Sequence, residues 1–172
     1  MQSTAYAASV GYSQPARFVS VDDPQRRDAV IAEYERSNRE AAGDYEGERF
    51  ARYAGLKLAG LREAPVHLAA FVDADTLRGA GLGRRTMPET LAYSVVVAVH
   101  TLWLAARARG IGVGWVSILD PRAIARILEV PAAWSLVAYL CVGYPQEEHL
   151  DRELARAQWE SEDSAATELY RR

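Results

Sequence analysis

The sequence contains very little that would cross-link the chain or carry it across a membrane. Its 172 residues include one cysteine, Cys141, so no disulfide can form within the chain. A lone cysteine is typical of a reducing compartment, and we expect a cytoplasmic protein. No apolar run reaches the roughly 20 residues that span a bilayer. The first residues also lack the basic and long apolar regions of a signal peptide.

An excess of charge of one sign is missing as well. The 20 Lys and Arg residues are opposed by 23 Asp and Glu residues, which gives a formal net charge of −3. This balance predicts neither a nucleic acid nor a membrane surface as partner. The three histidines, His67, His100 and His149, do not have the spacing of metal ligands, so we expect no metal site. His100 lies in an apolar helical stretch and is expected in the core.

The composition that remains is that of a globular protein, with 49% hydrophobic and 25% charged residues. Without an internal repeat or a linker-like stretch, residues 1–172 predict a single domain. Strands and helices alternate, which predicts the α+β class. Strands are expected over 17–21, 65–75, 111–118 and 135–145, and helices over 22–41, 88–110 and 121–130. A helical or mixed stretch is expected over 43–61 and a polar tail from 149. Asp23 with Pro24 favours the start of the first helix, and Asp120 with Pro121 the start of the last.

The helix over 88–110 carries the strongest structural prediction. Thr86, Pro88 and Glu89 favour its start, and Gly110 favours its end. Its central turns are apolar nearly all the way round, so we expect the helix to be buried on every side. A chain this short has little else to cover such a helix. We therefore predict a homodimer with this helix near the interface.

The glycine- and arginine-rich stretch GAGLGRR, residues 79–85, raises the question of phosphate binding. No Lys-Ser or Lys-Thr follows it, and it does not close the strand–turn–helix unit of a dinucleotide fingerprint. A mobile, solvated loop is the favoured interpretation. A lid over a nearby site is the alternative.

Two further segments contain candidate ligand-binding groups. In SVGYSQPARF, residues 9–18, the groups are Ser9, Ser13 and Gln14, and a ligand site and an ordinary polar turn are equally good interpretations. In GVGWVSILDP, residues 112–121, Ser117 lies within an apolar run that is typical of a buried strand. Gly114 would allow another group to approach the backbone. The plain interpretation of Ser117 is a hydroxyl bonded to its neighbouring backbone.

Four segments together resemble the 5,6-dimethylbenzimidazole synthases, a branch of the FMN-dependent nitroreductase superfamily. They are SVGYSQPARFV, LKLAGLREAPVHLAAFVD, the block from GLGRRTMPET to GWVSILDP, and WSLVAYLCVGYPQEEH, and the resemblance extends from Ala7 to Trp159. It implies a three-layer sandwich with a mainly antiparallel sheet flanked by helices, and a dimer with two FMN sites at the interface. It also implies that reduced FMN, delivered by a flavin reductase or another source, is fragmented with dioxygen to 5,6-dimethylbenzimidazole and erythrose 4-phosphate, without a metal.

The resemblance assigns roles to individual residues. It makes Ser117 catalytic, where a hydroxyl can hydrogen-bond the oxygenated flavin or help move a proton. Backbone at Ser117 and Ile118 would contact the flavin edge, with Gly114 allowing the approach, and Ser9 matches another flavin-contacting position. Lys57 matches a position that holds the pyrimidine edge, where a cation stabilises the anionic reduced flavin. Without the resemblance, Lys57 would be interpreted as a solvated lysine.

The sequence also departs from the family pattern. Related chains begin upstream with an arginine-rich segment that holds the FMN phosphate and supplies an aspartate that works with the serine. Ala16 stands where the pattern has tryptophan, and the tail after Trp159 is acidic. Three hypotheses follow: a synthase whose chain is short at the N-terminus, an NAD(P)H-dependent FMN oxidoreductase or nitroreductase, and a folded dimer that no longer holds FMN.

Overall fold

A computed structural model describes residues 1–56, 60–163 and 168–171. Its centre is a sheet in the order β1-β2-β4-β3, in which each neighbouring pair is antiparallel. The strands are β1 (Ala16–Ser20), β2 (Val66–Asp73), β3 (Gly112–Val116) and β4 (Trp134–Gly143). All four lie where the sequence predicts strands. β3 is shorter than expected, because it ends before Ser117.

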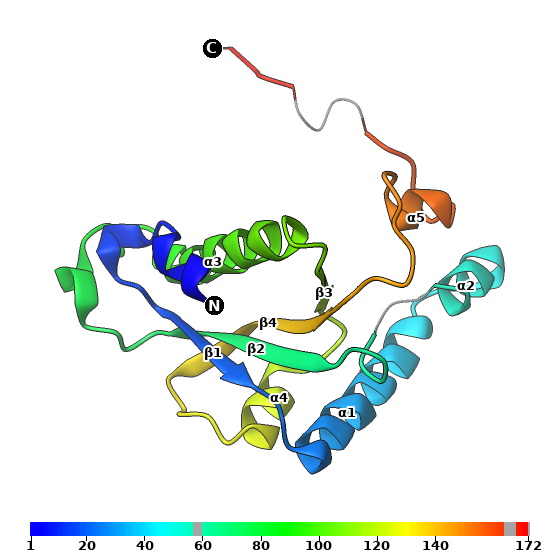
Figure 1. The fold of residues 1–172 in the computed structure, drawn as a ribbon, viewed down its shortest axis with the longest axis horizontal. Coiled ribbons are helices and arrows are strands. Elements are labelled where there is room, and N and C mark those ends of the chain that lie inside the picture. Colours follow the sequence, from blue (N-terminus) through cyan, green and yellow to red (C-terminus); the bar gives the residue numbers. More distant parts are fainter. Residues whose placement is uncertain (57–59, 164–167, 172) are drawn as a thin grey trace.

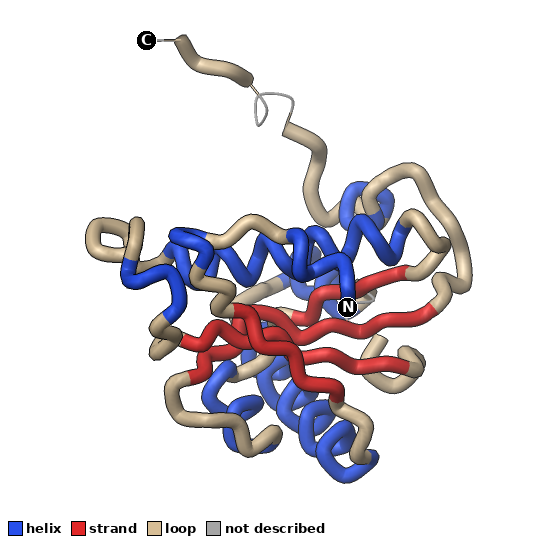
Figure 2. The backbone as a smooth tube through the Cα atoms, turned by 60° about the vertical axis from the view of Figure 1, so that its left-hand side comes forward, coloured by secondary structure: helices blue, strands red, loops and turns tan. Residues whose placement is uncertain are grey.

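Helices form a layer on each side of this sheet. The helices are α1 (Pro24–Ala42), α2 (Gly47–Ala54), α3 (Thr90–Arg107), α4 (Pro121–Ile127) and α5 (Glu153–Arg156), with 3-10 turns η1 (Gln2–Tyr6), η2 (Val10–Tyr12) and η3 (Arg78–Gly81). Helix α3 covers one face of the sheet, while α1 and α4 lie on the other (Figure 1). A second view shows the same three layers (Figure 2). The predicted α+β sandwich with an antiparallel sheet is confirmed.

The alternation of side chains along the strands divides the core in two. On the face toward α1 and α4, which we call the α4 face, the buried residues are Val21, Val30, Ile31, Leu61, Ala69, Phe71, Val116, Leu119, Ile124, Leu128, Tyr139 and Cys141. On the opposite α3 face, the buried residues are Ala70, Val72, Val95, Val99, Ala138 and Leu140. The α3 face therefore has the smaller core, made of smaller side chains.

The helix starts follow the predicted capping chemistry in two of three cases. Asp23 accepts a hydrogen bond from the backbone N–H of Gln25 (2.9 Å), with Pro24 in the first turn. Asp120 accepts one from Arg122 (2.8 Å) at the start of α4. The predicted start of α3 is displaced: the helix begins at Thr90, whose hydroxyl donates to the Met87 carbonyl instead (2.6 Å).

Helix α3 is not buried on every side of a single chain. Val95, Ala98 and Val99 pack on the sheet, but several apolar side chains of its outer surface are 39–54% exposed (Tyr93, Val96, Val97, Trp103 and Leu104). Within the described part of the chain, α3 alone is long and apolar enough to span a membrane, with a mean hydropathy of 1.3. Its packing on the sheet is that of a core helix. One chain covers only the sheet-facing side of α3, and burial of its outer surface by a second subunit stays a prediction.

Candidate functional site

The first candidate region is the serine segment, residues 9–14, which precedes β1. The Ser9 hydroxyl accepts a hydrogen bond from the backbone N–H of Gln14 (3.1 Å). The hydroxyl of Ser94 on α3 accepts one from Val10 (3.0 Å) and donates one to the Thr90 carbonyl (2.7 Å). The Ser94 hydroxyl therefore holds the segment against the first turns of α3, and the Ser9 hydroxyl closes a turn within the segment. An ordinary polar turn would not need the hydrogen bond between the Val10 N–H and the Ser94 hydroxyl.

A pocket of about 420 Å³ lies between this segment, η1, β1 and α3. Its walls combine polar and small apolar residues: Thr4, Ala5, Ala7, Ala8, Ser9, Gln14, Pro15, Ala16, Arg17, Phe18, Arg78, Ser94 and Ala98. The Arg17 guanidinium is engaged by Asp73 (2.7 Å) and by two backbone carbonyls. The Arg78 guanidinium lies 6.0 Å from the Tyr12 ring. Hydroxyl, amide and guanidinium donors beside apolar walls are a donor set that suits part of a flavin nucleotide.

The second candidate region follows β3, and here the expectation of a buried strand is wrong. β3 is an edge strand, Trp115 is 45% exposed, and Ser117 lies exposed just beyond the strand end. Ile118 is half-buried. A Cβ atom added to Gly114 would meet only ordinary contacts, the nearest 3.9 Å away at the Cys141 carbonyl. The chain itself does not require this glycine, which leaves its exposed backbone open to another group.

Glu33, which the sequence did not single out, anchors the loop that carries Ser117. Its carboxylate accepts a hydrogen bond from the backbone N–H of Asp120 (3.1 Å) and from Ser37 (3.0 Å), and it pairs with Arg36 (2.6 Å). The Arg36 hydrogen bond, supported by those from Asp120 and Ser37, lowers the pKa of Glu33 to about 2 against the opposing effect of burial. The spacing of Glu33 and Arg36 indicates only a helix-surface ion pair. No sequence signal reveals the contact with Asp120.

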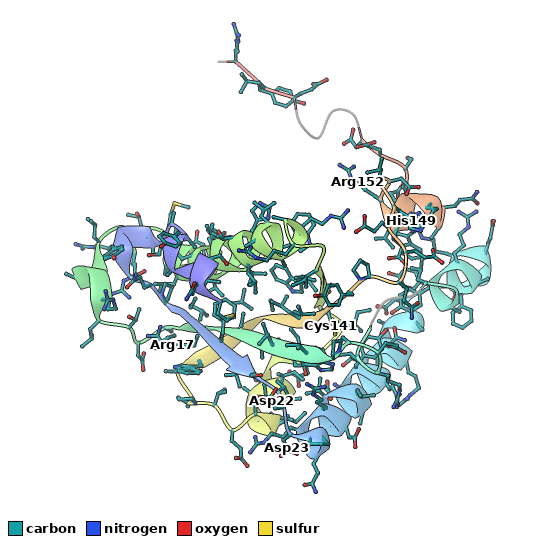
Figure 3. All side chains as sticks on the ribbon, in the orientation of Figure 1. Arg17, Asp22, Asp23, Cys141, His149 and Arg152 are labelled. Carbon is teal, nitrogen blue, oxygen red and sulfur yellow. The ribbon has the colours of Figure 1, made fainter. Side chains whose placement is uncertain are left out.

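The two regions lie at opposite edges of the sheet. β1 and β3 are its outer strands, and Val116 at the end of β3 is level with Val19 three strands away. Three strand spacings amount to roughly 14 Å. Arg17, beside the pocket, and Cys141, which pairs with Gly114, lie toward opposite ends of the sheet (Figure 3). One chain does not bring Ser9 and Ser117 together. Lys57 lies outside the described residues.

Three other expectations have clear outcomes. Residues 79–83 are solvated as predicted, with Ala80, Leu82 and Gly83 exposed, but one side of them packs against the serine segment, where a Cβ on Gly79 would lie 2.2 Å from the Gly11 carbonyl oxygen. His100 is exposed and stacks on Trp103, so its expected place in the core is wrong. Cys141, which lies in the predicted strand over 135–145, is buried, and burial raises the pKa of its thiol to about 11. Among residues 1–56, 60–163 and 168–171, no three His, Cys, Asp or Glu side chains gather as a metal site.

Comparison with known proteins settles the family. The model of the nitroreductase family matches residues 1–144. The chain belongs to the nitroreductase family. It is therefore a member of an oxidoreductase family.

Two relatives carry the same specific name. The chain is 59% identical over 155 residues to a protein from Rhodospirillum rubrum named 5,6-dimethylbenzimidazole synthase. The matched region covers 90% of this chain and 74% of the relative. The chain is 45% identical over 166 residues to a protein of that name from Rhodobacter capsulatus, covering 96% of this chain and 79% of the relative. The family resemblance stated from the sequence is confirmed.

Solved structures agree with the fold. Iodotyrosine deiodinase, in a structure bound to FMN and 3-iodo-L-tyrosine, superposes with a TM-score of 0.68 at 24% identity, covering 88% of this chain and 83% of that one. An FMN-dependent nitroreductase from Clostridium difficile gives a TM-score of 0.61 at 16% identity, covering 99% of this chain and 83% of that one. At these identities the likeness shows the shared fold alone.

Proposed function

We propose that this protein binds FMN and, once the flavin is reduced, fragments it with dioxygen to 5,6-dimethylbenzimidazole and erythrose 4-phosphate. The carrying observation is the 59% identity, over 90% of the chain, to a relative named for this synthesis. The product would supply the lower ligand of cobalamin. A flavin reductase or another donor, in a reducing cytoplasm, would deliver the reduced FMN.

The proposal gives Ser117 the catalytic role. When bound, reduced FMN would supply both the electrons for dioxygen and the ring carbons of the product. Ser117 follows an edge strand with its side chain exposed, so its hydroxyl can meet a bound ring. There it would hydrogen-bond an oxygen atom or move a proton. Backbone at Gly114 and Ile118 would contact the ring edge, and the Lys57 cation would stabilise the negative charge of the reduced flavin.

Ser9 would contact the flavin from the pocket beside the serine segment. Gln14 and the Arg78 guanidinium add donors on the same pocket wall. A phosphate would be held by charge-assisted contacts of this kind. This chain's residues thus fit an FMN molecule as two separate half-sites, one at the β1 edge and one at the β3 edge of the sheet.

We propose that a homodimer joins the two half-sites. The exposed outer surface of α3 and the exposed Trp115 lie on the same side of the sheet. An apolar groove of about 280 Å³ lies between them. It is lined by Val96, Val99, His100, Trp103, Val113, Trp115 and Leu140. An apolar surface of this kind on a single chain is typical of an interface between subunits. Each flavin would then contact Ser9 from one protomer and Ser117 from its partner.

A single-turnover experiment tests the proposed reaction. The purified chain is mixed with FMN, the flavin is photoreduced without oxygen, air is admitted, and 5,6-dimethylbenzimidazole is measured by chromatography. We expect product from the wild type and about 100-fold less from Ser117→Ala, because a positioned acid–base group contributes about that much. Ser135→Ala, which changes an exposed serine at the start of β4, is the matched control and should retain wild-type yield.

The other outcomes separate the remaining hypotheses. Intact, reoxidised FMN together with sustained turnover of NAD(P)H and a nitroaromatic would replace the proposal with a conventional FMN oxidoreductase. Protein that binds no FMN at all would indicate a folded remnant. Equal product from Ser117→Ala and the wild type would keep the synthase but remove Ser117 from catalysis.

A further inference from the structure

We propose that the glycine segment, residues 79–83, positions the serine segment for flavin binding, with Gly79 and Gly11 as the positioning residues. The inference rests on the proposed function, because it assigns these residues to the same FMN contact at Ser9. It gives the GAGLG motif a role in the contact with Gly11, which exposure of the loop to solvent does not explain.

The two segments approach each other backbone to backbone. A Cβ atom on Gly79 would lie 2.2 Å from the Gly11 carbonyl oxygen, and one on Gly11 would lie 2.4 Å from the Leu82 carbonyl oxygen. A Cβ on Gly83 would lie 2.9 Å from a methyl group of Val10. No side chain fits at these distances. The contact therefore exists only because both segments have glycine where they meet.

Both segments also hold strained backbone. On the serine segment, Gly11 (φ +52°), Tyr12 (φ +56°) and Gln14 (φ +46°) are left-handed, and on the glycine segment Ala80 has φ +48°. Side-chain-bearing residues rarely adopt this conformation. Such strain persists only where the surroundings hold it in place, and it gathers at functional sites. The two segments contact each other at this strained backbone.

Further hydrogen bonds connect the residues that flank the glycine segment to the serine segment. The Arg84 side chain donates to the Thr76 carbonyl (2.9 Å), and the Thr76 hydroxyl donates to the Ser13 carbonyl (3.4 Å). Ser13 is 1% exposed. A shift of the glycine segment would therefore be felt at Ser13 as well as at Gly11.

Displacing Gly11 would move the groups that face the pocket. Ser9 and Gln14 line the pocket and are joined by their own hydrogen bond across the turn that contains Gly11. Val10 is tied to Ser94 at the same turn. A side chain on Gly79 would displace the Gly11 carbonyl and so disturb the turn that these bonds hold. The predicted consequence is weaker FMN binding at the Ser9 half-site.

Gly79→Ala and Gly81→Ala form a matched pair for the test. Both glycines are left-handed, with φ of +74° and +77°, so an alanine strains the backbone alike at either position. A Cβ on Gly81 meets only the flexible end of Arg84, at 3.9 Å, whereas one on Gly79 meets the Gly11 backbone. We measure FMN affinity by flavin fluorescence and amide hydrogen exchange of residues 10–14 in the protein without FMN.

We expect Gly79→Ala to weaken FMN binding about tenfold and to speed exchange at residues 10–14, while Gly81→Ala stays within about threefold of wild type. Equal effects of the two variants would overturn the inference, because backbone strain alone would explain them. Wild-type affinity in Gly79→Ala would overturn it too. A wild type that binds no FMN would instead remove the proposed function, and the exchange data would still decide whether the glycine segment holds the serine segment.

A second pair keeps the test sharp if Gly79→Ala does not fold. Gly83→Ala clashes only with the Val10 side chain, so adding Val10→Ala removes the obstacle while the backbone strain stays. We expect Gly83→Ala to weaken FMN binding about threefold and the double variant to recover most of that loss. A double variant as weak as Gly83→Ala would contradict the positioning role.

Discussion

The two faces of the sheet differ in how completely one chain covers them. On the α4 face, the fully buried side chains are large and include Phe71, Tyr139 and Ile124. On the α3 face, the buried side chains are smaller on the whole, mostly alanine and valine, with Leu140 the largest. Small side chains bring α3 close to the sheet while its outer surface stays exposed. The α4 face is closed within the chain, and the α3 face is left open.

The difference separates stability from function. The pocket beside the serine segment and the apolar groove next to Trp115 both lie on the α3 side. The closed face also helps to position the site, because Glu33 on α1 accepts a hydrogen bond from the Asp120 N–H in the loop after β3. A large closed core fixes the backbone, and the proposed dimer contact and the proposed flavin contact at Ser9 lie on the open face. Substitutions on the two faces should therefore fail in different ways.

The largest expected effect is on the closed face. Phe71 is fully buried and contacts Trp134, so Phe71→Ala should lower the free energy of unfolding by about 3–5 kcal/mol. Leu104 on α3 is 51% exposed, and Leu104→Ala should cost no more than about 1 kcal/mol in dilute protein. Urea unfolding of both variants measures the contrast. Similar losses would mean that the outer surface of α3 is already part of the folded core.

The next effect tests the open face as an interface. Val97 is 41% exposed on α3, and Val97→Glu places a charge in the proposed contact between protomers. We expect the dimer dissociation constant to rise about 100-fold, since burying an unpaired charge in an interface centre is that costly. Light scattering across a concentration series measures it. Ala32→Glu, on an exposed position of α1, adds the same charge to the closed side and should leave the dimer intact.

The sequence predicted local structure well because its signals are local. Asp23 and Asp120 mark helix starts by chemistry within one turn, and the structure confirms both. Apolar runs predicted all four strands. The run through Trp115 and Ser117 was assigned to a buried strand because an edge strand and a central strand have the same composition. Only the strand order, which depends on the fold of the whole chain, makes β3 an edge strand and leaves its side chains accessible to solvent.

The candidate site was predicted in part, for the same physical reason. Ser9 and Ser117 were candidates from their own segments, and the family resemblance assigned their roles. The sequence did not indicate that they lie at opposite sheet edges. Left-handed glycines in residues 79–83 are a local signal, but their partner Gly11 is far away along the chain. The contact between Glu33 and the Asp120 backbone joins a helix to a distant loop. Contacts of this kind form between residues that are far apart in the sequence, so they produce no periodic pattern from which they could be predicted.

Glu33 provides a test of how the closed face supports the open one. Glu33→Gln loses the charge that holds Arg36 and weakens the bond from the Asp120 N–H, so we expect a loss of about 2 kcal/mol in unfolding free energy. Because the folded pKa of Glu33 is depressed to about 2, its contribution is present above the unfolded value near 4.5 and is lost as the pH falls toward 2. Unfolding of both proteins between these pH values measures it. Glu40→Gln, which removes only the exposed partner of Arg36, should cost less than about 0.5 kcal/mol. A similar cost for both would show that the Asp120 contact contributes nothing.

The smallest expected effect is a pH dependence within the closed face. His67 is fully buried, its Nδ1 atom lies 3.0 Å from the Tyr139 hydroxyl, and its Nε2 atom has no hydrogen-bond partner among the described residues. Burial lowers the pKa of His67, and the Arg27 cation lowers it further, against nearby backbone carbonyls that raise it. The unfolded chain therefore binds a proton more readily, near pH 6.5, than the folded chain does.

The sign follows from this difference. Stability should fall as the pH drops through 6.5 and level off below the lowered folded pKa, with about 1.4 kcal/mol lost for each unit between the two values. Unfolding free energies measured on either side of pH 6.5 should show a flatter slope for His67→Gln than for the wild type. Tyr139→Phe keeps the buried ring and removes only the hydroxyl near Nδ1, so it should keep the wild-type slope if burial is the main cause. A slope as flat as that of His67→Gln would assign the effect to the hydrogen bond between His67 and Tyr139. The loss of stability at low pH would then come from this one polar contact, and not from the exclusion of water around His67.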